Sequence, residues 1–127
     1  MREPQADSPM IHVAEYIPVR SYGRVLEVMR LSMKIYAHAR RCEGFVAGGL
    51  RTKWWRKQFW SYTVWEDHER LLHFVHTQPH ANAVARLLEF AAPGACYTEW
   101  VSEAPPDWDE ARERLKRPTR YMVPLWP

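Results

Sequence analysis

The stretch 59–88 holds the side chains of this chain that are best suited to chemistry. Trp65 closes a strand-like run, Phe74 falls within a helical segment, and His80 stands where a second helix begins after a proline-containing break. Side chains at these three places can converge on one apolar cleft. There the imidazole of His80 would take a proton from a phenol-like substrate, ligate haem iron, or only pack against the helix start.

Further side chains are candidates for the same cleft. Tyr36 on a long helix and Tyr97 on a later strand each offer a hydroxyl group, and His76 lies shortly before His80. His76 would assist His80, serve as a haem ligand in its place, or face solvent. Glu15 interrupts an apolar strand face, and we interpret it as an exposed or salt-bridged residue rather than a catalytic carboxylate. The assignment is therefore His80 as catalytic and, as substrate-binding residues, Trp65, Phe74, Tyr36, Tyr97 and His76.

The hydrophobic pattern predicts the elements that must position these residues. Apolar side chains alternate over 10–17, 45–55, 58–65 and 95–101, which is typical of strands. They recur every three or four residues over 25–39, 71–75 and 81–91, which is typical of helices, with Ser21, Asp67 and Thr77 as N-caps. The order β-α-β-β-α-β is that of an α+β, ferredoxin-like domain with helices on one sheet face.

Three features refine this expectation. Gly48-Gly49 inside the second strand predicts a bulge or a close approach of another group. Trp60, Tyr62 and Val64 lie on the sheet face away from the helices, so we expect a second copy to cover them in an isologous dimer. Residues 1–9 read as a flexible arm, 10–103 as the domain, and 104–127 as a capped C-terminal helix and tail that pack on the domain or on a partner.

The composition is that of an ordinary globular domain and restricts the possible partners. The chain has 127 residues with 18 basic and 15 acidic side chains, and this net charge of +3 is too mild to indicate nucleic acid. No apolar run is long enough to span a membrane, and the first residues do not resemble a secretory signal. Cys42 and Cys96 lack metal-type spacing, so we expect free thiols in a reducing cytoplasm.

The segment 61–66, together with Phe74 and His80, resembles the dimeric α/β-barrel superfamily of antibiotic-biosynthesis monooxygenases. The similarity is greatest to the branch of spheroidene-monooxygenase-like proteins and related domains of unknown function. In that branch a Trp at the strand end is followed by Phe nine residues on and by His six beyond, the intervals that separate Trp65, Phe74 and His80 here. The segments 99–101 and 105–115 are similar as well, so the resemblance covers about 14–115.

The resemblance implies a homodimer with a pocket between sheet and helices in each subunit. It also implies a monooxygenase of secondary metabolism that acts on a hydrophobic aromatic or polyene substrate, with no cofactor or with haem. Other superfamily members do no redox chemistry, so a haem or small-molecule binding protein and a non-redox cyclase or isomerase remain alternatives. A Gly-rich phosphate loop and a flavin or nicotinamide fingerprint are absent from the sequence.

An RNA-recognition domain is the alternative from a different class, because it shares the order of elements and displays aromatic side chains on its third strand. The segment 57–64 resembles its basic-aromatic motif but lacks the glycine after Lys57 and carries Trp60 where a small residue belongs. We interpret the basic residues around Trp54 and Trp55 as a solvated hairpin tip. We therefore expect no nucleic-acid partner.

Overall fold

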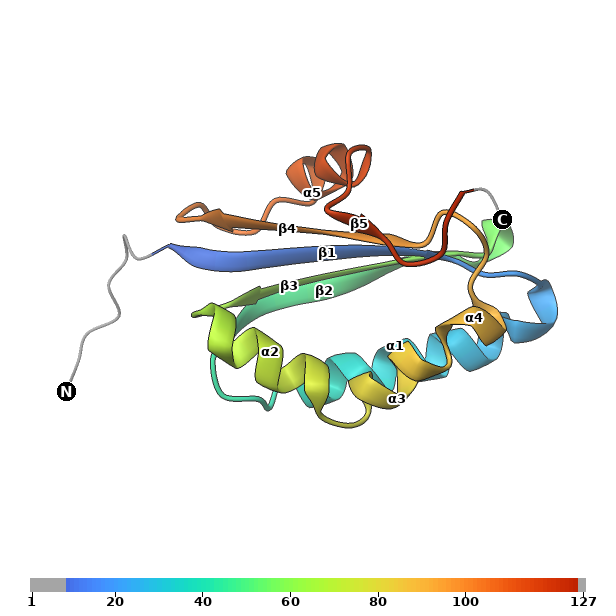
Figure 1. The fold of residues 1–127 in the computed structure, drawn as a ribbon, viewed down its shortest axis with the longest axis horizontal. Coiled ribbons are helices and arrows are strands. Elements are labelled where there is room, and N and C mark those ends of the chain that lie inside the picture. Colours follow the sequence, from blue (N-terminus) through green and yellow to red (C-terminus); the bar gives the residue numbers. More distant parts are fainter. Residues whose placement is uncertain (1–8, 126–127) are drawn as a thin grey trace.

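The computed structural model describes residues 9–125, and the expected 1–9 arm therefore lies almost wholly outside the described residues. One antiparallel sheet runs in the order β2-β3-β1-β4-β5. Figure 1 shows a helical layer beneath the sheet and one further helix above it. The strands are β1 (Met10–Pro18), β2 (Phe45–Lys53), β3 (Gln58–Trp65), β4 (Cys96–Ser102) and β5 (Arg120–Tyr121). The helices are α1 (Val25–Ala39), α2 (His68–His76), α3 (His80–Ala85), α4 (Leu87–Phe90) and α5 (Trp108–Leu115).

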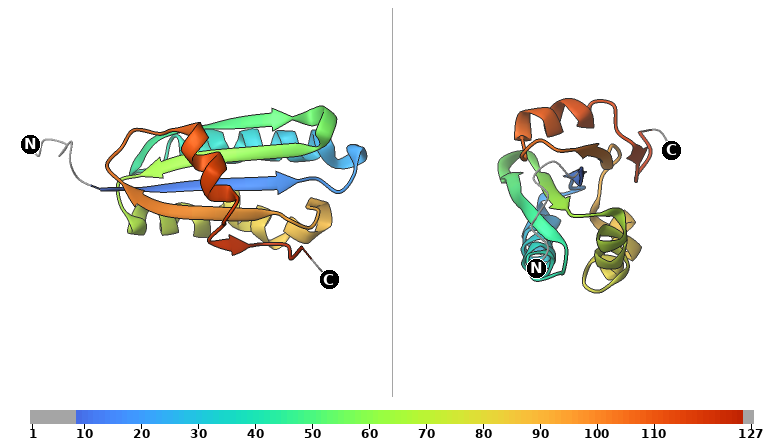
Figure 2. Two further views of the ribbon diagram at one scale, coloured as in Figure 1. Left: turned by 90° about the horizontal axis from the view of Figure 1, so that it is seen from above. Right: turned by 90° about the vertical axis from the view of Figure 1, so that its left-hand side faces the viewer.

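The expected ferredoxin-like α+β fold is confirmed, with helices α1 to α4 on one face of the sheet. Figure 2 shows α1 and the α2–α4 segment side by side beneath the strands. The strand pairs β1–β3 and β1–β4 place β1 at the centre of the sheet. Its alternation therefore decides which side chains enter the helical layer and which point to the opposite face.

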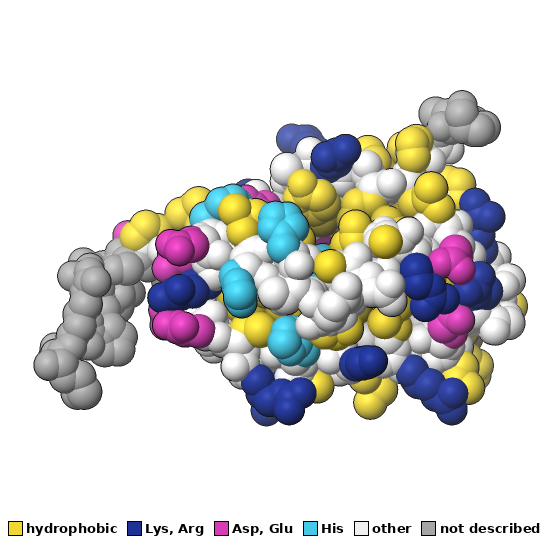
Figure 3. Space-filling view, turned by 60° about the horizontal axis from the view of Figure 1, so that its bottom comes forward, with side chains coloured by type: hydrophobic (Ala, Val, Ile, Leu, Met, Phe, Trp, Pro, Cys, Tyr) yellow, Lys and Arg dark blue, Asp and Glu magenta, His cyan; other side chains and the backbone are white. Residues whose placement is uncertain are grey.

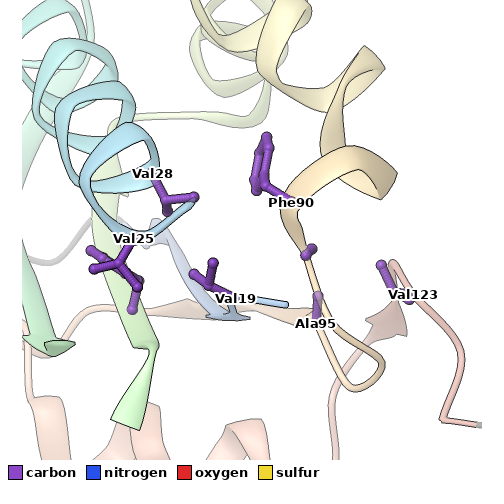
Figure 4. Close-up of a cluster of buried hydrophobic side chains, with 8 residues drawn as sticks. Val19, Val25, Val28, Phe90, Ala95 and Val123 are labelled. Carbon is purple, nitrogen blue, oxygen red and sulfur yellow. The ribbon is translucent and has the colours of Figure 1, made fainter. Parts of the chain in front are cut away.

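Two apolar clusters fill the two ends of the helical layer. One of them contains Val13, Trp65 and Phe74 and lies near α2. The other joins Val28 of α1, Phe59 of β3 and Phe90 of α4, close to Val19 and Val123 (Figure 4). The middle of the layer, between these clusters, is where space remains.

Part of the opposite sheet face is covered by α5 of the same chain, whereas Trp60 on this face is only partly buried. Tyr62 and Val64 are fully buried in a cluster with Trp100 and Ala111, and Trp108 packs edge-on against Tyr62. Tyr62 and Val64 are therefore hidden without a partner subunit, and dimerisation stays a prediction. Helix α5 also covers part of the aromatic surface on which an RNA-recognition domain would stack bases.

Several local expectations were wrong. The second strand ends at Lys53, because Trp54–Arg56 forms a 3₁₀ turn and Lys57 adopts a left-handed φ of 57° that reverses the chain. Ser21 makes no side-chain cap. The hydroxyl of Thr77 donates to the carbonyl of Phe74 instead of capping the next helix. Asp67, by contrast, caps α2 as expected.

The helix expected over 81–91 is broken at Arg86 into α3 and α4. The break turns the two pieces relative to each other. As a result Ala83 and Phe90 face the core, whereas Val84 and Leu88 of the expected apolar stripe are 52% and 64% exposed. The bulky Phe90 ring, which joins the cluster with Val28 and Phe59, accounts for this choice of face.

Gly48 is the position in β2 where another backbone approaches closely, as the glycine pair predicts. A Cβ atom at Gly48 would clash with the backbone carbonyl oxygen of Tyr62. At Gly49 it would lie 3.5 Å from the Trp108 ring, an ordinary van der Waals contact. The carbonyl of Gly48 also accepts the Tyr36 hydroxyl at 2.7 Å. This contact joins the edge strand to α1.

We predict that Gly48→Ala lowers the free energy of unfolding by about 2 kcal/mol or more, because a backbone atom cannot move aside as a side chain can. Gly49→Ala is the matched control and should change it by less than about 0.5 kcal/mol. Urea unfolding monitored by circular dichroism measures both values. Equal effects of the two substitutions would contradict the close approach at Gly48.

Candidate functional site

A largely apolar cavity lies between the sheet and the helices α1, α3 and α4. Its volume is about 120 Å³, close to the roughly 150 Å³ cavities that bind benzene. Val84 lines it and is 52% exposed, so the cavity reaches the surface beside α3. In Figure 3, which brings the helical layer forward, hydrophobic side chains show between the helices and histidines gather over the α2 end. A single ring-sized apolar group fits this space.

One carboxylate and one imidazole, those of Glu15 and His80, line the cavity. Glu15 enters it from β1, between the inward-facing Val13 and Ile17, and His80 is the first residue of α3. The Nε2 atom of His80 lies 3.7 Å from Oε1 of Glu15, an ion-pair distance. Their side chains are only 13% and 28% exposed, respectively. A carboxylate on this apolar wall is therefore paired with an imidazole.

The second ring nitrogen of His80 fixes the tautomer of the neutral imidazole. Its Nδ1 atom lies 3.2 Å from the carbonyl oxygen of Val75. The Val75 carbonyl and the Glu15 carboxylate both only accept hydrogen bonds, but only the Nδ1–Val75 distance is within hydrogen-bond range. We therefore assign the proton of the neutral ring to Nδ1, which donates it to Val75. Nε2 of the neutral ring is then the basic atom, and it faces Glu15 and the cavity.

The environment of His80 has opposing effects on its pKa. Burial lowers the pKa, whereas the Glu15 carboxylate and the Val75 carbonyl raise it, and the net result is a pKa above the ordinary value. Because the carboxylate stabilises the protonated ring, His80 is a stronger base than a free imidazole. The group can thus hold a proton that it has removed from a ligand.

Aromatic packing holds the His80 ring in place. The Trp65 and Phe74 rings stack with centroids 4.9 Å apart, and the centroid of the His80 ring lies 5.0 Å from that of Phe74. Trp65 is fully buried, and its Nε1 donates to the Thr63 hydroxyl. The three residues at the spacing singled out in the sequence therefore form one contiguous cluster of rings that ends at the cavity, with Trp65 stacked on Phe74 and His80 tilted against it.

The structure brings some of the predicted site residues together and leaves others apart. His80, Phe74 and Tyr36 line the cavity, although the Tyr36 hydroxyl is already bonded to Gly48. Trp65 lies behind Phe74 and does not line it. Tyr97 is paired with Glu15 in the β1–β4 register but is not part of the lining, and His76 is exposed on α2.

Sequence reasoning gave Glu15 too little weight. The structure places it on the cavity wall and confirms the salt-bridged interpretation. The signal was visible, because a carboxylate between two inward-facing apolar residues must be compensated by a partner. What the sequence could not show is that His80 lies opposite it.

The residues around His80 do not fit haem. Both ring nitrogens already face protein groups, and a cavity of about 120 Å³ has no room for a porphyrin. Within residues 9–125 there is also no group of three or more His, Cys, Asp or Glu side chains that could hold a metal ion. The described helices include none that is long and apolar enough to cross a bilayer.

Solved structures from several organisms share this fold. A conserved protein from Methanosarcina mazei is 16% identical with a TM-score of 0.65, and the match covers 75% of this chain and 94% of that one. SnoaB, a cofactor-independent oxygenase from Streptomyces nogalater, is also 16% identical with a TM-score of 0.55, covering 79% and 96%. A further structure, described as an antibiotic biosynthesis monooxygenase, is 15% identical with a TM-score of 0.61, covering 76% and 99%. At these identities the similarity shows the fold.

One family matches the sequence directly. Residues 22–120 match the family described as "Domain of unknown function (DUF3291)". No curated protein matches the sequence. The matched range contains α1 to α5 and includes His80 but not Glu15.

We predict that Glu15→Gln lowers the pKa of His80, because the amide removes the negative charge that opposes the effect of burial. The pH titration of the His80 ring protons in NMR spectra measures it. The His12 ring, which lies on the opposite sheet face beside Tyr62, should be unaffected and serves as the internal control. An unchanged His80 pKa in the variant would show that the pair is not formed.

The same pair predicts how stability depends on pH. A raised pKa in the folded state means that the stabilising contribution is fully present below the unfolded-state value of about 6.5 and is lost as the pH rises through the folded-state value. Glu15→Gln should remove this part of the pH dependence. Thermal unfolding of the wild-type protein and of Glu15→Gln across this pH range measures the difference. The same dependence of melting temperature on pH in both proteins would contradict a stabilising Glu15–His80 pair.

Proposed function

This chain belongs to the DUF3291 family, and we propose that it is an enzyme that deprotonates an apolar, ring-containing substrate in the cavity beside Glu15 and His80. The observation that carries the proposal is the pairing of a carboxylate with an imidazole on the wall of an otherwise apolar cavity. Such a wall binds a neutral apolar ligand and presents a base to one ionisable group on it. His80 Nε2 is that base, and Glu15 stabilises the imidazolium that forms.

The chemistry of the base narrows the substrate class. A phenol or naphthol has a hydroxyl proton that an imidazole can remove, whereas a hydrocarbon polyene has no comparably acidic proton. The cavity volume also favours one ring at the reacting end over a fused polycyclic system lying wholly inside. We therefore propose a hydroxyarene substrate in preference to a polyene.

We further propose that the phenolate reacts with molecular oxygen, since two proteins of the same fold are described as a monooxygenase and as a cofactor-independent oxygenase. Removal of the hydroxyl proton by His80 gives the phenolate, whose para carbon is electron-rich and adds oxygen to form a peroxide. Loss of water then gives the quinone, so that the naphthol and one oxygen molecule yield naphthoquinone and one water. The substrate is the reductant, and the apolar wall excludes bulk water from the anion.

The other residues of the site have supporting roles in this proposal. Phe74, backed by Trp65, holds the imidazole ring at the cavity edge, so both are positioning residues. Tyr36 shapes the wall from α1. A homodimer, as the superfamily resemblance implies, remains part of the proposal.

We predict that His80→Gln lowers the rate of oxygen uptake with a naphthol by roughly 10²–10⁴-fold, the usual contribution of a general base. Glu15→Gln should lower the rate less and move the acidic limb of the pH–rate profile to lower pH, since the pKa of His80 falls. His76→Gln is the matched control: this exposed histidine does not line the cavity and should keep full activity.

Binding of the naphthol, measured separately by calorimetry, distinguishes an enzyme from a carrier. If the protein is an enzyme, His80→Gln should bind the naphthol as tightly as the wild-type protein does but should no longer consume oxygen. Full oxygen uptake by both His80→Gln and His80→Ala would overturn the role of His80. Binding by the wild-type protein with no product formed would support a small-molecule binding protein instead.

A further inference from the structure

The tip of the β2–β3 hairpin carries large aromatic side chains that the cavity does not use. Trp54 is 58% exposed, Trp55 is 53% exposed, and Tyr22, which precedes α1, is 61% exposed. The Tyr22 hydroxyl donates to the Trp55 carbonyl, so the three rings belong to one surface. Figure 2 shows this hairpin at the end of the sheet where α1 begins. We call this the tip surface, formed by Tyr22, Lys53, Trp54, Trp55, Arg56 and Lys57.

Backbone hydrogen bonds fix the turn that carries the exposed side chains of the tip surface. Lys57 has a left-handed φ of 57°, and its backbone N–H donates to the Trp54 carbonyl. The Lys57 carbonyl in turn accepts the Val19 N–H at 2.7 Å, which fixes the turn to the end of β1. A turn whose backbone is already ordered loses little backbone conformational entropy when a partner covers it. Clusters of exposed aromatic side chains mark interaction sites.

The tip surface is also strongly basic. Residues 44–65 contain Arg51, Lys53, Arg56 and Lys57 and no acidic residue. The Lys57 ammonium lies 5.0 Å from the centre of the Tyr22 ring. No salt bridge within residues 9–125 involves Lys53, Arg56 or Lys57. Their charge is therefore available to an anionic partner.

We propose that the tip surface docks on an anionic phospholipid bilayer. Trp and Tyr side chains favour the headgroup region, and Lys and Arg beside them are attracted to anionic lipids. The Trp54 and Trp55 rings are perpendicular, with an interplanar angle of 90°, so successive bases of a nucleic acid could not stack on both. Docking would bring the cavity to the phase in which apolar substrates concentrate, but the inference does not depend on the chemistry at His80.

Sedimentation of the full chain with vesicles tests the proposal. We expect binding to vesicles of equimolar phosphatidylcholine and phosphatidylglycerol, weakening with salt, and little binding to phosphatidylcholine alone. The variant Trp54→Ser/Trp55→Ser should lose most of this binding. Replacement of the three cations by Lys53→Gln/Arg56→Gln/Lys57→Asn should weaken it by roughly 10–100-fold. Asn is chosen at the last position because it tolerates the left-handed conformation.

Matched controls remove the same apolar area or charge elsewhere. Met33→Ser/Leu88→Ser changes two side chains that are 60% and 64% exposed on the helical layer, and Arg112→Gln/Arg117→Gln/Arg120→Gln removes three exposed cations around α5. Both should bind vesicles like the wild-type protein. Circular dichroism of all variants verifies that each is folded.

Three outcomes would overturn the proposal. The first is that the wild-type protein fails to bind the mixed vesicles, and the second is that the tip and control variants lose binding equally. The third is that the protein binds a single-stranded RNA oligonucleotide and does not bind vesicles. A wild-type dimer that the Trp54→Ser/Trp55→Ser variant dissociates, without vesicle binding by either protein, would assign the tip surface to contact with a second copy.

Discussion

The candidate site depends on one constraint: the Glu15 carboxylate lies on an apolar wall and needs a partner of opposite charge. Glu15 points into the helical layer from the central strand, between Val13 and Ile17, where an uncompensated charge would be costly. His80 compensates it, and can do so because α3 begins at this residue and the Trp65–Phe74 stack supports its ring. The hydrogen bond from Nδ1 to Val75 then leaves Nε2 as the basic atom. The aromatic rings thus position the imidazole, the Val75 carbonyl selects its tautomer, and Glu15 raises its basicity.

The two faces of the sheet are packed differently, and only the helical face leaves space for a cavity. On the α5 face, His12, Tyr62 and Trp100 fill the space, and the His12 ring is hydrogen-bonded to the Tyr62 hydroxyl at 2.7 Å. Burial lowers the pKa of His12, so this histidine stays neutral inside the packed cluster. On the helical face the apolar clusters occupy the ends and leave the middle open. A histidine with a raised pKa faces that opening.

Much of the fold could be predicted from periodicity alone, because alternation and helical spacing depend on local sequence. The central strand, α1, β3 and the Asp67 cap were predictable in this way. Contacts between residues far apart in the sequence could not be predicted in this way. Periodicity places Glu15 on the inner face but cannot show that His80 lies opposite. It likewise places Tyr62 on the outer face but cannot show that Trp108 covers it. Tyr97 has the predicted face but lies outside the cavity lining.

The protonation state of the neutral His80 ring tests the account most directly. A long-range nitrogen–proton correlation spectrum, recorded at a pH above the pKa of His80, distinguishes the two tautomers. The account predicts the tautomer with the proton on Nδ1 and a bare Nε2 facing Glu15. A neutral ring with the proton on Nε2 would contradict it, because the atom that faces the cavity would then be a donor and could not act as a base.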